Sequence, residues 1–277
     1  NVSLPGEVPM SVKVAFSIGA LIFLITILYT VLTTHEYPPS DLKEFKRSRK
    51  EKLKFRKLII ELLNNIREMP ITMRKLGLVQ FFSWFAFFSM WSLATPALTD
   101  HVFNSPKPNK IQFSIANELE KTNYQVADKA YNDAADQVGA YMGYYGLSSM
   151  LFALALTFYT SRNRINRKLL HIFSLLAGAI GFLSMYLIND PRFLLFSFVL
   201  IGLSWGSILS MPYAMLSSFI DSNKMGLSMG IFNMFIVIPQ ILAAKALNPI
   251  YSILGKEAIY AMILAGICLL LAAVSTI

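Results

Sequence analysis

Residues 193–220 read FLLFSFVLIGLSWGSILSMPYAMLSSFI, a stretch of 28 residues without one Asp, Glu, Lys or Arg. An α-helix rises about 1.5 Å per residue, so roughly 20 apolar residues cross the hydrocarbon core of a bilayer. This stretch is therefore long enough to form a membrane-spanning helix. Six further charge-free runs of 20 to 25 residues occur, namely residues 14–35, 76–99, 137–161, 169–189, 225–244 and 258–277.

The overall composition agrees with a membrane protein. Hydrophobic residues make up 55% of the 277-residue chain and charged residues 15%, whereas a soluble domain has about 45–50% and 25%. The seven runs together hold 160 residues. These values exclude a soluble enzyme, a nucleic-acid-binding domain and a secreted disulfide scaffold. The sequence predicts an all-α polytopic membrane protein.

The distribution of charge between the runs predicts its orientation. Residues 34–75 hold twelve Lys and Arg against six acidic residues, and residues 96–138 hold four Lys against six acidic residues. The short link 162–168 has four basic residues and no acidic one. Because Lys and Arg concentrate in cytoplasmic loops, we expect the amino terminus outside and residues 34–75, 161–168 and 221–225 inside. The net charge of +9 thus reflects topology, and no nucleic-acid partner is expected.

Two of the connecting segments are predicted to contain helices. Residues 42–68 carry an apolar stripe of helical period, which fits either an amphipathic helix on the inner leaflet or a linker helix packed under the bundle. The polar outer segment 96–138 is expected to form one or two short helices over residues 111–134. His101, beside Asp100 in that segment, is either a proton relay or an exposed histidine at the loop edge.

The predicted spans carry neutral amides and aromatic rings at helical spacing. Amides exchange hydrogen bonds with hydroxyl groups, and flat rings stack on the apolar faces of a pyranose. Such residues also have structural roles, because aromatic rings anchor helices at the interface and amides join helices inside it. The predicted sugar contacts are Gln80, Trp84, Trp205, Asn233 and Gln240, with Tyr144 and Tyr213 as further candidates.

Proline and small residues indicate where these helices bend and pack. Pro212 and Pro239 fall within spans, where each removes a backbone hydrogen bond, and we expect both to act as hinges. Gly226, Ser228 and Gly230 have a spacing suited to close helix packing. The sequence predicts no metal site and no cofactor. It shows no His/Glu/Asp cluster and no Ser–His pair within the spans, which argues against a membrane enzyme.

Three segments resemble one family of carriers. Residues 202–217, GLSWGSILSMPYAMLS, and residues 226–240, GLSMGIFNMFIVIPQ, resemble helices ten and eleven of the sucrose/maltose–proton symporters. These form the glycoside-type branch of the major facilitator superfamily. Residues 79–91, VQFFSWFAFFSMW, look like helix seven of the same group.

The resemblance implies a domain organisation. Residues 1–33 would be the last helix of the amino-terminal half of a twelve-helix carrier, and residues 34–75 the basic central loop. Residues 76–277 would be the carboxy-terminal six-helix half, with its outer loop at residues 96–138. The fold expected is therefore a half bundle of six helices preceded by one extra helix.

The resemblance also implies a function. It indicates secondary active uptake of a disaccharide such as maltose or sucrose with protons, in a bacterial inner (plasma) membrane. The partners expected are the sugar, the proton, membrane lipid and the missing amino-terminal half. Plant members carry an acidic residue late in helix seven, where this chain reads SLATPAL over residues 92–98. A coupling carboxylate is therefore expected in the missing half.

Three alternatives stay open at this point. The chain could be a facilitator, or it could carry another small solute. Seven spans with an outside amino terminus are also the topology of a receptor. The cysteine pair that commonly ties the outer loops of such receptors cannot form here, because Cys268 is the only cysteine.

Overall fold

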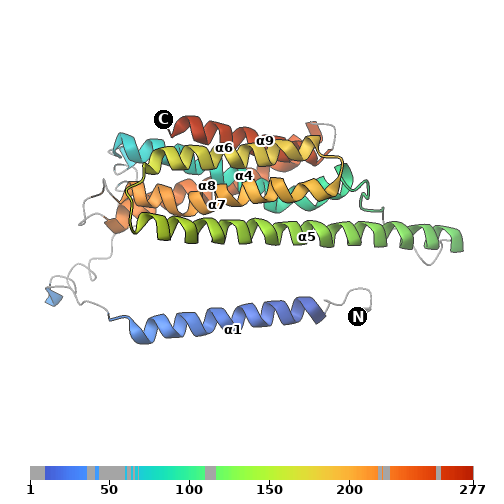
Figure 1. The fold of residues 1–277 in the computed structure, drawn as a ribbon, viewed down its shortest axis with the longest axis horizontal. Helices are drawn as coiled ribbons and strands as arrows, with labels where there is room; N and C mark the ends of the chain where they lie inside the picture. The colour runs from blue at the N-terminus through green and yellow to red at the C-terminus, as the bar shows by residue number, and fades with distance from the viewer. Residues whose placement is uncertain are drawn as a thin grey trace. The chain divides into compact units, whose positions relative to one another are not determined.

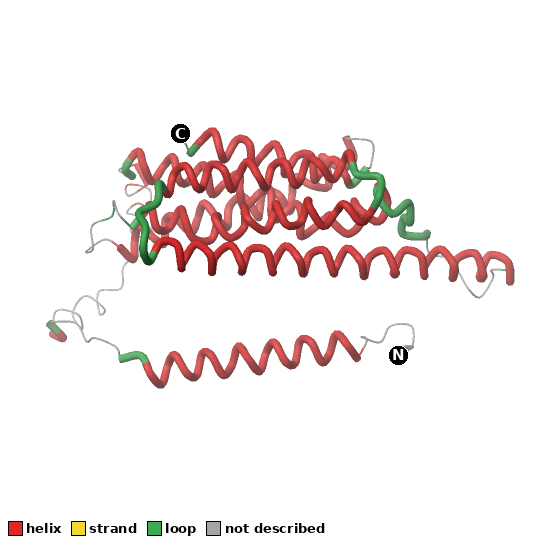
Figure 2. The backbone as a smooth tube through the Cα atoms, viewed as in Figure 1, coloured by secondary structure: helices red, strands yellow, loops and turns green. Residues whose placement is uncertain are grey.

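The computed structural model describes residues 10–35, 41–43, 60, 64, 66–67, 69–109, 117–217, 220, 225–253 and 257–276. Over these residues the chain forms seven α-helices and one short 3₁₀ helix, and no strand (Figures 1 and 2), which confirms the all-α prediction. It divides into two units, residues 1–60 and 61–277. The helices are α1 (Met10–Thr33), α4 (Ile71–His101), α5 (Glu118–Thr160), α6 (Arg167–Leu187), η1 (Pro191–Phe193), α7 (Leu194–Leu216), α8 (Met225–Ile253) and α9 (Ile259–Ser275).

Each of the seven charge-free runs overlaps one of the seven α-helices. Among the described residues, five helical segments are long and apolar enough to cross a membrane. Helix α9 is apolar but has only 17 residues. The five segments are Val12–Thr33, Ile71–His101, Arg167–Leu187, Pro191–Leu216 and Ser228–Leu247.

The first unit contains α1, whose 24 residues are mostly apolar, with Lys13 near its start as the one charged residue. Its three threonines satisfy their hydroxyl groups within the helix. Thr26, Thr30 and Thr33 donate to the carbonyl oxygens of Ile22, Thr26 and Tyr29, at 3.0, 2.9 and 2.7 Å. A mostly apolar helix whose threonine hydroxyl groups bond within the helix is suited to lipid.

The second unit is a six-helix bundle organised around α4. This helix contacts α9, α8, α5 and α7, while α6 packs on α7 and α9, and α5 packs on α7. The core contains large side chains with 0% exposure, among them Phe87, Phe182 and Phe198. Local capping fixes two helix starts, because the side-chain oxygens of Asn117 and Asn166 accept hydrogen bonds from the first turns of α5 and α6.

Small residues hold the helices of this unit close together. A Cβ atom placed on Gly202 of α7 would lie 2.7 Å from Cβ of Ser148 on α5, so only glycine fits at this approach. Gly178 of α6 faces Ser204 of α7 in the same way. The prediction that Gly226 and Gly230 provide close packing is wrong within the described residues, where a Cβ on either meets nothing within 4 Å.

The outer segment differs from its prediction. Instead of short helices over residues 111–134, one continuous helix, α5, runs for 43 residues from Glu118. The reason is local: Asn117 and Glu120 form a reciprocal capping box, and the following residues are helix formers that join the apolar run without a break. At about 1.5 Å per residue the helix is about 64 Å long, twice the hydrocarbon thickness, and Figure 1 shows it extending beyond the other helices of its bundle.

One other predicted segment boundary differs in the structure, and one predicted helix cannot be compared with it. Residues 96–101 belong to α4 and not to a loop. The predicted amphipathic helix over residues 42–68 lies largely outside the described residues.

Candidate functional site

The three tryptophans of the chain meet in one aromatic cluster between α4 and α7. The ring centroids of Trp84 and Trp91 each lie 5.2 Å from the centroid of Trp205, at interplanar angles of 74° and 90°. The ring centroid of Phe87 lies 4.7 Å from that of Trp205. The indole of Trp91 donates a hydrogen bond of 3.2 Å to the hydroxyl oxygen of Tyr145 on α5. Edge-to-face contacts of this kind fix the orientation of each ring.

The structure therefore brings together two of the predicted contacts, Trp84 and Trp205, from helices far apart in the sequence. Three members of the cluster come from α4, because residues 84, 87 and 91 are three and four positions apart and therefore lie on one face of the helix. Tyr145 and Phe87 were not among the predicted contacts. Their membership depends on how α5 and α4 are rotated in the bundle, and the spacing along each helix does not reveal that rotation.

Gln80 lies one turn before Trp84 on α4 and is 0% exposed. Neither its Nε2 nor its Oε1 has a hydrogen-bond partner among the described residues, and the same holds for the indole nitrogen of Trp84. A buried amide without a partner costs about 1–3 kcal/mol, so such groups are uncommon in a finished core. Gln80 and Trp84 thus hold unused hydrogen-bonding capacity beside the aromatic cluster.

A second pair of predicted contacts meets where α7 and α8 face each other. The Tyr213 hydroxyl donates a hydrogen bond of 3.0 Å to Oδ1 of Asn233. The Tyr213 ring packs edge-on against Phe232, with centroids 5.5 Å apart. Asn233 is exposed, and its Nδ2 group carries two further N–H donors. This pair can present an oriented amide to a polar solute.

The remaining predicted contacts lie apart from these two groups. Gln240 donates through Nε2 to the carbonyl oxygen of Ile236, 3.1 Å away on its own helix. Tyr144 is exposed on α5, where its ring lies 6.4 Å from that of Tyr141. Pro212 and Pro239 are both inside helices, α7 and α8, as their sequence positions predict.

One buried pair, a histidine of α6 and a serine of α7, was not predicted from the sequence. His171 of α6 is 0% exposed, and its Nδ1 lies 2.8 Å from the hydroxyl oxygen of Ser207 on α7. The statement that no Ser–His pair lies within the spans is therefore wrong. Its burial keeps the pair away from any solute that reaches the helix surfaces. A histidine inside the charge-free run 169–189 was the only sequence signal for it.

His101 differs in position from the exposed loop-edge histidine that was one of its two predictions. It is the last residue of α4, its ring stacks on Tyr186 of α6 at 5.3 Å, and its Nε2 lies 2.9 Å from the Tyr186 carbonyl oxygen. It therefore joins two helix ends and does not stand free at a loop edge.

Comparison with known proteins gives the family. The model of the Major Facilitator Superfamily matches residues 8–244, which is most of the chain. A search among curated proteins finds no match. Members of this superfamily are membrane transporters, and the apolar helices described above are those of an integral membrane protein. The chain belongs to the Major Facilitator Superfamily and is a membrane transporter of that type.

Proposed function

We propose that this transporter is a secondary active sugar carrier that takes up a disaccharide of the maltose or sucrose type by alternating access. The observation that carries the proposal is the contact of Trp84 with Trp205 beside the unpartnered amide of Gln80. Rings and neutral amides together suit a solute with many hydroxyl groups and apolar ring faces.

The second group of contacts supports a ligand larger than one ring. Tyr213 follows Trp205 by eight residues on α7, so about 12 Å of helix separates them. A disaccharide that stacks on the tryptophan cluster would then place its second ring toward the Tyr213–Asn233 pair. In this arrangement Tyr144 and Gln240 would engage only after a side-chain or helix movement.

The domain organisation and the energy source are part of the proposal. We assign residues 1–33 to the last helix of an amino-terminal half, 34–75 to a basic cytoplasmic loop and 76–277 to the carboxy-terminal half. Pro212 and Pro239 would allow α7 and α8 to bend as the halves rock about the site. Proton symport across a bacterial plasma membrane follows from the resemblance to the sucrose/maltose symporters, with the coupling carboxylate in the other half.

The experiment is a binding titration of maltose and sucrose on the purified full-length carrier. Trp205→Phe keeps an aromatic ring but reduces its stacking face, so we expect binding to weaken about 2- to 12-fold, equivalent to about 0.5–1.5 kcal/mol. Phe196→Leu changes an exposed aromatic residue of the same helix and should leave binding unchanged. Equal affinity in the Trp205→Phe and parent proteins, or no binding of either sugar by a folded carrier, would refute the proposed substrate.

A further inference from the structure

The buried histidine of α6 has one ring nitrogen without a partner. His171 is 0% exposed, and its Nδ1 lies 2.8 Å from the hydroxyl oxygen of Ser207 on α7. Its Nε2 is buried as well, but it has no hydrogen-bond partner among the described residues. A neutral imidazole has one N–H group and one bare nitrogen, so either position of the proton leaves Nε2 unsatisfied. A purely structural histidine in a core would use both nitrogens.

The contact between α6 and α7 holds a second polar group of this kind. Ser204, one turn before Ser207 on α7, is 0% exposed, and its hydroxyl oxygen has no partner in the part of the chain that the structure describes. A Cβ atom placed on Gly178 of α6 would lie 2.6 Å from this oxygen, so the two helices approach closely here. Two polar atoms in one close helix contact are therefore left with hydrogen-bonding capacity that the contact does not use.

The helices packed against His171 offer no group that would stabilise a positive charge on its ring. Helix α6 packs on α7 and α9, and neither of these contains Asp, Glu, Lys or Arg. The titratable residues of the two helices are Tyr213, Tyr260 and Cys268. On α6 itself the charged residues are Arg167 and Lys168, one turn before the histidine, and both are cations. An imidazolium here would be a buried cation without a counter-ion, which is a costly arrangement.

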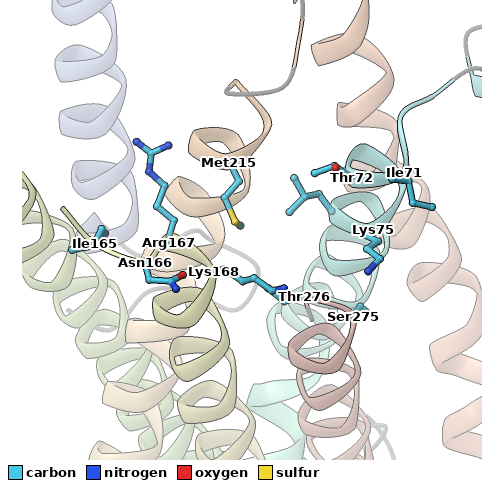
Figure 3. Close-up of a pocket in the computed structure, with 11 residues that line it drawn as sticks. Ile71, Thr72, Lys75, Ile165, Asn166, Arg167, Lys168, Met215, Ser275 and Thr276 are labelled. Carbon is cyan, nitrogen blue, oxygen red and sulfur yellow. The ribbon is translucent and has the colours of Figure 1, made fainter.

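The end of α6 is about one helical turn from this histidine. His171 follows Arg167, the first residue of α6, by four positions, or about 6 Å. Arg167 and Lys168 line a pocket of about 610 Å³ between helix ends, which is large enough for water (Figure 3). Residues 161–168 carry four basic side chains and no acidic one, so this end is predicted to face the cytoplasm. A small separation of α6 from α7 at this end would bring water to Nε2.

We propose that His171 is a proton-binding site, and that it takes up a proton from the cytoplasm when the contact between α6 and α7 opens at that end. The packed contact accepts only the neutral imidazole, whereas water in the opened contact solvates both N–H groups of the imidazolium. Proton binding and opening are therefore linked: a more acidic cytoplasm favours the opened contact, and a neutral one favours the packed contact. The proposal does not rest on the sugar assignment, because it uses none of the predicted sugar contacts.

The size of the linkage follows from the titration of a histidine in water, which occurs near pH 6.5. If only the opened contact binds the proton in this range, its stabilisation by protons grows about tenfold between pH 7.5 and pH 5.5. The equilibrium constant for opening should therefore be about tenfold greater at pH 5.5 than at pH 7.5.

The test is amide hydrogen–deuterium exchange of the full-length carrier in detergent at these two pH values, corrected for the intrinsic pH dependence of exchange. Peptides that cover residues 167–178 report the opening. His171→Gln keeps a hydrogen-bonding side chain but does not titrate in this range, so we expect its opening constant to change less than twofold. His171→Leu is a second variant that does not titrate, with the same expectation.

Two control variants retain the imidazole of His171. His101→Gln makes the same substitution at a histidine that stacks on Tyr186 of α6, and it should keep the tenfold change. Ser207→Ala removes the hydrogen-bond partner, and it should open more readily at both pH values but keep the tenfold ratio.

An opening constant that does not change with pH in the parent would overturn the proposal. An equal pH response in the parent and in the His171 variants would also overturn it, because another group would then be binding the proton. Loss of the response in Ser207→Ala would show that packing at this contact sets it, and this result too would contradict proton binding by His171.

Discussion

The hydrogen bond between Tyr213 and Asn233 gives the sharpest test of the proposed site. The variant Tyr213→Phe removes only the hydroxyl group that donates to Asn233 Oδ1 across 3.0 Å. The ring, and its edge-on packing against Phe232, are retained. We therefore expect the fold to survive and the orientation of the Asn233 amide to be lost.

The size of the effect follows from the kind of bond. A hydrogen bond between neutral groups contributes about 0.5–1.5 kcal/mol net, which corresponds to a factor of about 2 to 12 in a dissociation constant. If the bond exists to orient the amide toward the sugar, the affinity for sugar should fall by about this factor in Tyr213→Phe. Asn233→Ala, which removes the amide itself, should weaken sugar binding at least as much while leaving membrane insertion intact.

The assay is a double-mutant cycle of sugar affinity on the full-length carrier, with Tyr213→Phe, Asn233→Ala and the double variant. Because the hydroxyl acts through the amide, the double variant should bind no more weakly than Asn233→Ala alone. Tyr159→Phe, an exposed tyrosine of α5, is the control and should bind as the parent does. Two effects that simply add, or unchanged binding and transport kinetics in Asn233→Ala, would remove this pair from the site.

Three further predictions concern the bundle. Gly202→Leu should destabilise the carrier by about 1–3 kcal/mol, because the added side chain meets α5 directly, whereas Gly143→Ala faces open space and should not lower the melting temperature; equal melting temperatures would contradict the close approach. Gln80→Leu should raise the melting temperature without sugar and weaken sugar binding, because the buried amide has no partner among the described residues; a lower melting temperature would mean that the amide is already satisfied. Ser207→Ala should cost about 1–3 kcal/mol of stability by leaving Nδ1 of His171 without its partner, and an unchanged thermal denaturation curve would refute this.

Much of the fold follows from the sequence because lipid imposes a simple rule. A charge-free run of twenty residues must satisfy its backbone within itself, so each run predicts a helix, and each overlaps one. The rule does not predict the length of α5, because the first part of this helix is polar and lies outside any charge-free run. The prediction places one or two short helices in this polar segment and separates them from the apolar run, although the capping box at Asn117 and Glu120 is present in the sequence.

The candidate site was only half predictable. Spacing along one helix groups Gln80 with Trp84, because both lie on α4. It does not reveal that Trp205 faces Trp84, that Tyr213 reaches Asn233, or that His171 meets Ser207. These contacts join different helices and depend on the rotation of each about its axis. In the structure that rotation is set by close approaches such as Gly202 against Ser148.

The most direct test of the proposed function is uptake of labelled maltose and sucrose by cells that express the full-length gene, with and without a protonophore. The proposal predicts accumulation of at least one sugar, and collapse of that accumulation when the protonophore is added. Uptake that only equilibrates, whether or not the protonophore is present, would contradict proton coupling and indicate a facilitator or another ion. No uptake of either sugar by cells that contain the carrier in their membrane would contradict the proposed substrate.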